Sequence, residues 1–261
     1  MLTFLKLGGS LITDKKVERG FRRPVMTRLA AEIASALQES PDLRLLIGHG
    51  SGSFGHFAAS RHKTIEGVHT PEEWRAFAEV ATVAAELNYL VTDTLHKAGV
   101  PTWRIQPSAS AISQNGEMIE MNVLPIQRAL EHHLVPLVYG DVCLDEIRGG
   151  TITSTEKIFF FLANQLPVDR IILLGEVEGV LDTGHQIIPQ ITPENISHIL
   201  DALGGSSGVD VTGGMETKVQ DMLELARQNQ NLTIRIMTGL HEGLVYQTLV
   251  GRVTPGTVIS V

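Results

Sequence analysis

Apolar residues follow two alternating patterns along this chain. Short continuous apolar runs are typical of buried strands, whereas apolar residues that recur every three or four positions are typical of helices. Short runs of this kind, some of them interrupted by polar residues, predict strands at Leu2–Leu7, Leu43–Gly48, Thr102–Gln106, Met118–Met121, Val135–Val138, Asp169–Leu174 and Thr233–Met237. The longer stretches predict helices from Pro24 to about Glu39, after Pro71, after Asn122, from about Ser154 to Gln165, and from Gly213-Gly214 to Arg227.

Strands that alternate with helices are typical of α/β proteins, in which helices cover both faces of a mostly parallel sheet. We therefore predict a three-layer αβα sandwich around an open, mostly parallel sheet. The chain has no internal repeat, no low-complexity tract and no Ser/Gly linker. It is accordingly expected to form a single domain over residues 1–261, with a soft boundary near Pro167 between lobes 1–166 and 167–261.

Composition narrows the class of protein. The chain has 261 residues, of which 43% are hydrophobic and 19% charged, so it can build a substantial core and is not disordered. A net charge of -8 argues against a nucleic-acid-binding surface. The lone Cys143 excludes an intramolecular disulfide and a multi-cysteine zinc site. No apolar stretch approaches the roughly 18 residues that span a membrane. Without a leader-like pattern after Met1, a cytoplasmic protein with no membrane partner is expected.

Two glycine-rich segments follow the first two predicted strands, where open α/β sheets place ligands. Gly8-Gly9-Ser10 follows Lys6, and its backbone N–H groups can approach an anion closely. The alternative is a tight turn with a lysine at the edge of the sheet. His49–His56 reads HGSGSFGH and favours capture of a phosphate, with His56 as a directional donor. A histidine that only supports the loop is the alternative here.

Two further glycine segments lie in the second half of the chain. Val209–Lys218 places Gly213-Gly214 at the start of a helix and Lys218 about one turn inside it, from where the lysine can reach a phosphate. An ordinary solvated lysine would fit the same pattern. Leu174–Leu181 follows a strand, and it could wrap a nucleotide base or form a simple turn.

A dinucleotide-binding oxidoreductase is a competing interpretation, because Gly50, Gly52 and Gly55 fit G-x-G-x-x-G after a strand. That fingerprint also needs a carboxylate about 20 residues later, at the end of a second strand. Here Arg61–Pro71 is polar and irregular instead. A non-catalytic nucleotide-binding module is a further alternative. The P-loop, zinc-protease and nucleophile-elbow motifs are absent from the sequence.

Taken together, these segments resemble the amino acid kinase superfamily and, within it, the isopentenyl phosphate kinases. The resemblance covers nearly the whole chain. The matching segments are KLGGSLITDK (Lys6–Lys15), HGSGSFGH (His49–His56), IQPS (Ile105–Ser108), GDV (Gly140–Val142), EVEGV (Glu176–Val180) and DVTGGMETK (Asp210–Lys218). The first, second and last of these are highly specific in combination.

The resemblance implies transfer of the γ-phosphoryl group of ATP to isopentenyl phosphate, with Mg²⁺ as cofactor and a homodimer as the assembly. A kinase for another phosphate or phosphonate, of the UMP or fosfomycin type, is the sister reading. Lobe 1–166 would hold the phosphate acceptor and lobe 167–261 the ATP. The resemblance implies catalytic roles for Lys6, Lys15, His56 and Lys218. The implied ATP-binding residues are Lys6, Gly8, Gly9, Ser10, Gly52, Gly175, Glu176, Glu178, Gly179, Gly214 and Lys218. The implied acceptor-binding residues are Gly50, Ser51, Gly52, His56 and Thr155, and no protein ligand to a metal is implied.

The sequence departs from the family pattern at several of these positions. Ser51 replaces a third consecutive glycine, and Glu176 and Glu178 replace commoner aspartates. The family's Ser-Gly-Asp-Asp is Ser154-Thr155-Glu156-Lys157 here. Glu156 could orient the lysines, as the family aspartate does, or it could form a helix capping box with Thr153.

The residue types suit transfer between two phosphates. A phosphate monoester is already largely dianionic at neutral pH, so no general base is needed, and the obstacle is repulsion between two anions. Lysines, backbone amides and Mg²⁺ would supply the counter-charge. The organic tail of the acceptor is expected against an apolar stripe on the long helix, made of Phe77, Val80, Ala81, Ala84 and Leu87.

Overall fold

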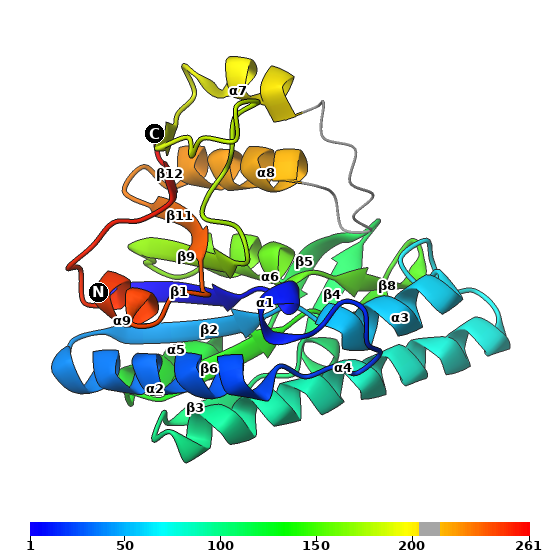
Figure 1. Ribbon diagram of the computed structural model, residues 1–261. Coiled ribbons are helices and arrows are strands. Elements are labelled where there is room, and N and C mark those ends of the chain that lie inside the picture. Colours follow the sequence, from blue (N-terminus) through cyan, green and yellow to red (C-terminus); the bar gives the residue numbers. More distant parts are fainter. Residues whose placement is uncertain (204–214) are drawn as a thin grey trace.

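The computed structural model describes residues 1–203 and 215–261, with their side chains apart from those of residues 56, 59, 60 and 201–203. Eight strands form one large sheet (Figure 1). Their order is β10 (Gln190–Ile191), β12 (Thr257–Ile259), β11 (Thr233–Thr238), β9 (Arg170–Gly175), β1 (Leu2–Leu7), β2 (Arg44–His49), β6 (Val135–Tyr139) and β3 (Thr102–Arg104). All neighbouring strands in it are parallel except β11 and β12.

Helices cover both faces of this sheet (Figure 1), so the predicted three-layer αβα fold is confirmed. One layer contains α2 (Arg23–Glu39), α4 (Pro71–Lys97) and α9 (Leu244–Leu249). The other contains α5 (Leu124–Glu131), α6 (Thr155–Ala163) and α8 (Met215–Gln228). The alternation of β1 explains both cores: Leu5 and Leu7 pack in the first layer's core, and Leu2 and Phe4 pack in the second. In the described part of the chain, no helix is long and apolar enough to cross a membrane.

A second, four-stranded sheet was largely missed by the sequence analysis. Its order is β5 (Glu117–Met121), β4 (Ala111–Gln114), β7 (Asp141–Asp145) and β8 (Gly149–Thr153), and only β5 matches an expected strand. These strands carry polar and glycine residues, so their apolar pattern is weak. The chain passes from the large sheet to the small one between β3 and β4, and again at Gly140, between β6 and β7.

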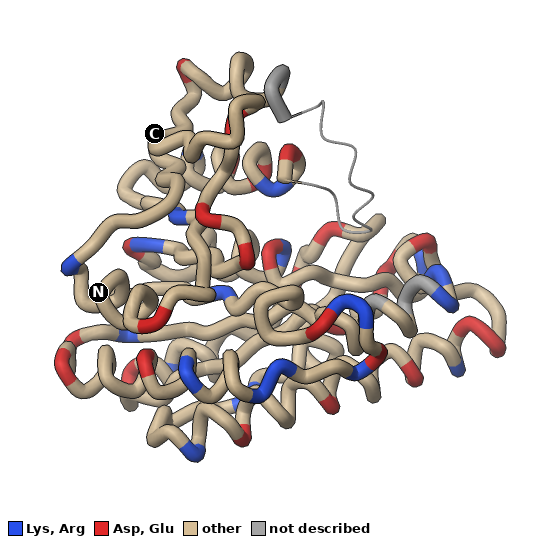
Figure 2. Tube along the Cα trace, in the orientation of Figure 1, with Lys and Arg blue, Asp and Glu red and all other residues tan. Residues whose placement is uncertain are grey.

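The short helices lie where strands end. α1 (Gly9–Ile12) follows β1, and α3 (Gly52–His62) follows β2. The glycine-rich segment after β2, which was expected to be a loop, therefore becomes helical at Gly52. Its glycines obscured the helix because glycine has poor helix propensity. The 3₁₀ helix η1 (Pro107–Ala109) and α7 (Ile196–Leu203) complete the elements of the described chain. Figure 2 shows basic and acidic residues interspersed along the outer helices and loops.

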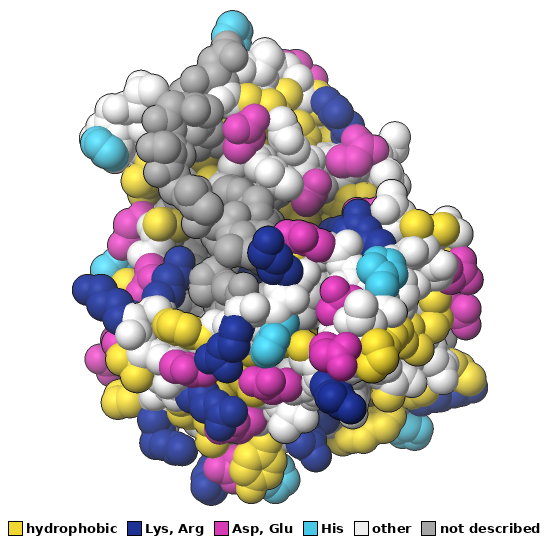
Figure 3. Space-filling model, turned by 90° about the vertical axis from the view of Figure 1, so that its right-hand side faces the viewer, with side chains coloured by type: hydrophobic (Ala, Val, Ile, Leu, Met, Phe, Trp, Pro, Cys, Tyr) yellow, Lys and Arg dark blue, Asp and Glu magenta, His cyan; other side chains and the backbone are white. Residues whose placement is uncertain are grey.

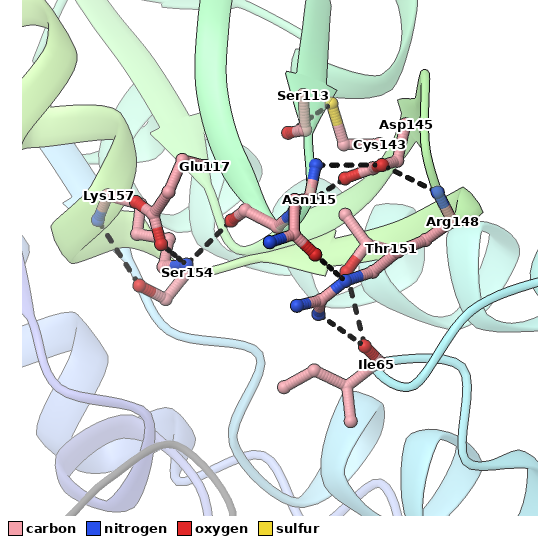
Figure 4. A network of polar contacts seen from close by, with 11 residues as sticks. Ile65, Ser113, Asn115, Glu117, Cys143, Asp145, Arg148, Thr151, Ser154 and Lys157 are labelled. Carbon is pink, nitrogen blue, oxygen red and sulfur yellow. Dashed lines mark hydrogen bonds and ion pairs between the residues drawn. The ribbon is translucent and has the colours of Figure 1, made fainter.

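A buried carboxylate holds the two turns of the small sheet together (Figure 4). Asp145 is 4% exposed and accepts backbone N–H groups from Asn115 and Gly116 in one turn, and from Ile147 and Arg148 in the other, over 2.6–3.0 Å. Burial would raise the pKa of this carboxyl, but the four donors lower it below its ordinary value. One buried carboxylate thus joins the β4–β5 turn to the β7–β8 turn.

The same network ties the small sheet to its surroundings (Figure 4). The guanidinium of Arg148 donates to the carbonyl of Ile65, in the loop between α3 and α4, at 3.2 Å. Lys157 in the first turn of α6 donates to the carbonyl of Gly116 at 2.6 Å and pairs with Glu117 at 2.7 Å. The hairpin β4–β5 is thus fastened to α6 on one side and, through β7–β8, to the α3–α4 loop on the other.

We expect Asp145→Asn to lower the free energy of unfolding by about 2–4 kcal/mol, because an NH₂ group would face buried N–H donors. Asp182→Asn is the matched control, since Asp182 also accepts backbone N–H groups, from Gly184 and Gln186, but in an exposed turn. Its cost should stay below about 1 kcal/mol. Urea unfolding of both variants checks this, and equal costs would contradict the role given to Asp145.

Candidate functional site

The two glycine segments meet backbone to backbone at the carboxyl edge of the sheet. β1 and β2 are paired with Leu7 opposite His49, so the residues that follow emerge side by side. A Cβ atom on Gly9 would lie 2.7 Å from the nitrogen of Gly52, and one on Gly50 would lie 3.0 Å from the nitrogen of Gly9. Only glycine permits this approach, which explains the residue type at these positions.

Thr13 locks the two segments together and was not identified from the sequence. Its buried hydroxyl donates to the carbonyl of Gly9 at 2.7 Å and accepts the N–H of Ser53 at 2.9 Å. Gly52 has a positive φ of +50°, and a Cβ atom there would overlap the Thr13 hydroxyl. No local sequence signal marks Thr13, because its partners are brought to it by the pairing of β1 and β2.

This junction presents unpaired backbone donors. Within the described chain, the N–H groups of Gly9, Ser10, Ser51 and Gly52 have no hydrogen-bond partner. They belong to the starts of α1 and α3, neither of which has a side-chain cap. Free N–H groups and the positive end of a helix dipole favour anions. Two helix starts in contact can therefore hold two neighbouring anionic groups.

Two lysines converge on one carboxylate beside the junction. Lys6, at 8% exposure, places its ammonium 2.7 Å from Glu156, and the ammonium of Lys218 lies 3.8 Å from the same oxygen. Burial would raise the pKa of Glu156, but Lys6 and Lys218 outweigh it and lower the pKa to about 2. One ionised carboxylate thus fixes two ammonium groups, and the three groups together carry a net positive charge.

The structure also resolves the two readings of Glu156. The N-cap of α6 is Ser154, whose hydroxyl accepts the N–H of Lys157 at 3.2 Å. The hydroxyl of Thr153 is buried and has no hydrogen-bond partner. The alternative of a capping box between Thr153 and Glu156 is therefore wrong, because Ser154 caps the helix and Glu156 is paired with the lysines.

Thr155 holds the backbone of His49, the residue that begins the second glycine segment. Its buried hydroxyl donates to the carbonyl of His49 at 2.6 Å, and the N–H of Gly140 donates to the same carbonyl at 3.1 Å. The hydroxyl proton is used inside the protein, and a phosphate dianion can only accept hydrogen bonds. A contact between Thr155 and the acceptor, which the resemblance implies, therefore cannot use this hydroxyl proton, and it stays a prediction for the backbone N–H group of Thr155.

The IQPS and GDV segments lie against each other next to this carbonyl. The carboxylate of Asp141 accepts the N–H of Ser108 at 3.2 Å and that of Val142 at 2.8 Å. Burial raises the pKa of Asp141 above its ordinary value, although these donors oppose the shift. Asp141 thereby holds the Pro107–Ala109 turn at the point where the chain changes sheets.

The segment after β9 lies at the same carboxyl edge of the large sheet, because β9 is the neighbour of β1 on the side opposite β2. Glu176 pairs with Arg22 at 2.6 Å, and Glu178 contacts the imidazole of His241 at 2.8 Å. Gly179 is buried where a Cβ atom would lie 2.8 Å from the Thr257 hydroxyl. A hollow of about 590 Å³ adjoins this segment, and its lining includes Glu176, Val177, Glu178, Leu181, His185 and Ile187.

Not all of the expected residues are brought together. Lys15 lies exposed in the turn after Thr13, and no ion pair of its ammonium is found with the described residues. His56 belongs to α3, but its side chain lies outside the described part, as does Gly214 altogether. Figure 3 looks onto this edge and shows acidic, basic and histidine side chains intermingled over it.

The pKa of Glu156 leads to a pH-dependent prediction. A carboxyl whose pKa is about 2 when folded and 4.5 when unfolded contributes stability above pH 4.5 that is lost as the pH falls towards 2. Relative to Glu156→Gln, the wild-type free energy of unfolding should fall by roughly 1.4 kcal/mol per pH unit in that window.

Chemical unfolding at several pH values measures this slope. Glu117→Gln is the control, because Glu117 also pairs with a lysine at 2.7 Å but is 75% exposed. It should change the slope little. Parallel curves for wild type and Glu156→Gln would contradict the ion pairing.

Comparisons with known proteins agree with this geometry. The sequence matches the profile of the amino acid kinase family over residues 1–238. It is 33% identical to the isopentenyl phosphate kinase of Methanocaldococcus jannaschii, over 97% of this chain and 96% of that one. It is 34% identical to that of Haloferax volcanii, over 86% and 88%. A solved structure, "X-ray structures of isopentenyl phosphate kinase", covers 100% of both chains with a TM-score of 0.84 and 29% identity.

Proposed function

The chain belongs to the amino acid kinase family, and we propose that it transfers the γ-phosphoryl group of ATP to isopentenyl phosphate, giving isopentenyl diphosphate. The observation that carries this proposal is the contact between two uncapped helix starts, α1 and α3, beside Lys6 and Lys218. It offers two adjoining anion sites, as a reaction between two phosphates requires. The similarity to isopentenyl phosphate kinases supports the choice of acceptor.

In this mechanism the amides of Gly9 and Ser10 hold the phosphoryl group in transfer, and those of Ser51 and Gly52 hold the acceptor phosphate. Lys6 and Lys218 neutralise the charge between the two groups, at positions set by Glu156. Because the acceptor oxygen is already ionised, the protein's task is positioning and charge stabilisation. His56 and Lys15 are proposed to join from the acceptor and donor sides respectively.

We propose that ATP enters as its magnesium complex. Among the described residues, no group of three or more His, Cys, Asp or Glu side chains could hold a metal ion. Magnesium in kinases is held largely by substrate phosphates and water, with few protein ligands. The ion would therefore be bound as part of the substrate. The segment Gly175–Gly179 is proposed to hold the nucleoside.

The acceptor's tail is proposed to lie against a small apolar cluster next to α3. Phe77, Val80 and Ala81 on α4 pack there with Ala58 of α3 and with Val142 and Ile152 of the small sheet. Farther along the expected stripe, Leu87 is fully buried in the main core between α2 and the sheet. The expected stripe therefore belongs to two different clusters. Only its first part, Phe77, Val80 and Ala81, is proposed to contact the substrate.

The same proposal includes a division of labour and an assembly. Residues 1–166 supply both anion-binding helix starts, and residues 167–261 supply Lys218 and the nucleoside segment. A homodimer is proposed through β3, whose outer edge has no neighbouring strand in the described chain and bears Trp103, 42% exposed. An unpaired edge is suited to strand pairing with a second copy.

An acceptor panel tests the function. In an assay of ADP release, isopentenyl phosphate should be used at least roughly tenfold more efficiently, in kcat/KM, than UMP or fosfomycin, because the tail cluster is small and apolar. Efficient turnover of UMP or fosfomycin, with none of isopentenyl phosphate, would replace this proposal by its sister reading.

The same assay tests the role of Lys15, with the neighbouring Lys16 as the control. Lys15→Met should lower kcat by roughly 10²-fold or more if its ammonium reaches the transferring group. Lys16, which is also exposed in the same turn, should tolerate the same change. Equal activity of the two variants would remove Lys15 from the site and leave the rest of the proposal intact.

The tail cluster makes a separate prediction. Phe77→Ala should enlarge the cluster's space and raise kcat/KM for longer prenyl phosphates relative to isopentenyl phosphate by roughly tenfold. Leu87→Ala, a change in the main core, should lower the melting temperature and leave this ratio unchanged. An unchanged ratio in Phe77→Ala would place the tail elsewhere.

A further inference from the structure

The first histidine of HGSGSFGH has a defined set of partners that the mechanism above does not use. His49 ends β2 and is 0% exposed. Its Nδ1 lies 3.0 Å from the carbonyl oxygen of Gly50, its Nε2 lies 3.1 Å from the side-chain nitrogen of Asn88 on α4, and its ring stacks on Tyr139 at 5.6 Å. Both ring nitrogens are therefore satisfied inside the protein.

These partners determine which nitrogen carries the proton. A carbonyl oxygen can only accept, so Nδ1 must be the donor to Gly50. Burial lowers the pKa of His49 to about 4, so the ring is neutral near pH 7 and Nε2 accepts from the Asn88 amide. The Asn88 amide thus fixes the tautomer of His49. The Nδ1–H group of that tautomer then fixes the orientation of the Gly50 carbonyl.

The direction of the Gly50 carbonyl sets the direction of the next N–H group. In a trans peptide the C=O of one residue and the N–H of the next point in opposite directions. Because the Gly50 carbonyl points back towards the His49 ring, the Ser51 N–H points away from it. The Ser51 nitrogen lies beside Gly140, because a Cβ atom built on Gly140 would be 3.7 Å from it. Among the described residues this nitrogen has no hydrogen-bond partner.

We propose that His49 is a positioning residue, which aims the N–H of Ser51 at the acceptor phosphate through its hydrogen bond to the Gly50 carbonyl. This inference rests on the proposed function, because it assigns the Ser51 amide to that substrate. The peptide between Gly50 and Ser51 has a glycine on one side, so it would otherwise rotate more freely. The imidazole supplies the constraint that the glycine lacks.

The surroundings of His49 support this role. Its own carbonyl accepts from Thr155 and from Gly140, so the backbone on both sides of the ring is held. Asn88 lies on the same face of α4 as Val80 and Ala84, at helical spacing. The histidine therefore connects the helix proposed to meet the acceptor's tail with the amide proposed to meet its phosphate.

Two substitutions separate positioning from packing. Asn carries its side-chain nitrogen as many bonds from Cβ as Nδ1 of His, so His49→Asn retains a donor to the Gly50 carbonyl. Gln carries its side-chain oxygen as many bonds from Cβ as Nε2 of His, so in His49→Gln this oxygen still accepts from the Asn88 amide, while no donor remains at the Nδ1 position. Both variants lose the stack on Tyr139, and we expect similar falls in melting temperature.

Steady-state kinetics give the main readout. His49→Gln should raise KM for isopentenyl phosphate and lower its kcat/KM by roughly tenfold or more, with KM for ATP nearly unchanged. His49→Asn should retain acceptor use within about threefold of wild type, since its donor remains. Equal loss in both variants, in step with the melting temperature, would show that His49 only packs. Normal acceptor kinetics in His49→Gln would also overturn the proposal.

A second measurement tests the proposal even where the variants do not fold, or where the wild-type protein does not use isopentenyl phosphate. In ¹⁵N spectra of the wild-type protein near pH 7, the His49 ring should show the Nδ1–H tautomer, and the Ser51 amide should shift on addition of inorganic phosphate. An Nε2–H tautomer, or a Ser51 amide that does not respond, would overturn the inference. Absent turnover of isopentenyl phosphate with both signals present would instead refute the proposed function alone.

Discussion

The structure of the site depends on one steric constraint, the contact between the backbones of Gly9 and Gly50–Gly52 at the ends of β1 and β2. A single side-chain carbon at Gly9 would lie within 2.8 Å of the nitrogen and Cα of Gly52. The contact brings two uncapped helix starts together, so the unpaired amides of the two segments lie close to each other. Thr13 preserves this spacing by bonding to both segments. Two phosphates can then be held near each other without a dedicated protein base.

Charge around this junction is arranged by a carboxylate. Two neighbouring ammonium groups would repel each other, and Glu156 offsets that repulsion at 2.7 Å from Lys6 and 3.8 Å from Lys218. Glu156 stands where the resemblance implies an aspartate, and its longer side chain reaches Lys6. Beyond it, Lys157 fastens α6 to the β4–β5 hairpin, and Asp145 and Arg148 extend that connection to the α3–α4 loop. The carboxylate and its two lysines are therefore connected, through α6 and the small sheet, to the loop between α3 and α4.

Much of the main architecture could be predicted from local pattern. Strands β1, β2, β6 and β9 are mostly apolar runs, and β11 has apolar residues at alternate positions. Helices α2 and α4 have clear helical periodicity, because each buries a continuous face. The small sheet could not be predicted in this way. β7 alternates buried Cys143 and Asp145 with Val142 and Leu144, so polar residues occur on its covered face. Their cost is offset by hydrogen bonds from distant turns, and those partners cannot be found in a local sequence window.

For the site, the sequence by itself determined the residue types: glycines after two strands, a lysine at the end of β1, and motifs that resemble those of the amino acid kinases. Only the tertiary structure decided how they are used. It paired Glu156 with Lys6 and Lys218, bound the Thr155 hydroxyl to the His49 carbonyl, and placed Asn88 against the His49 ring. The physical reason is that a motif records local spacing, whereas each of these contacts joins residues from different elements. Their distances are set by sheet register and helix packing.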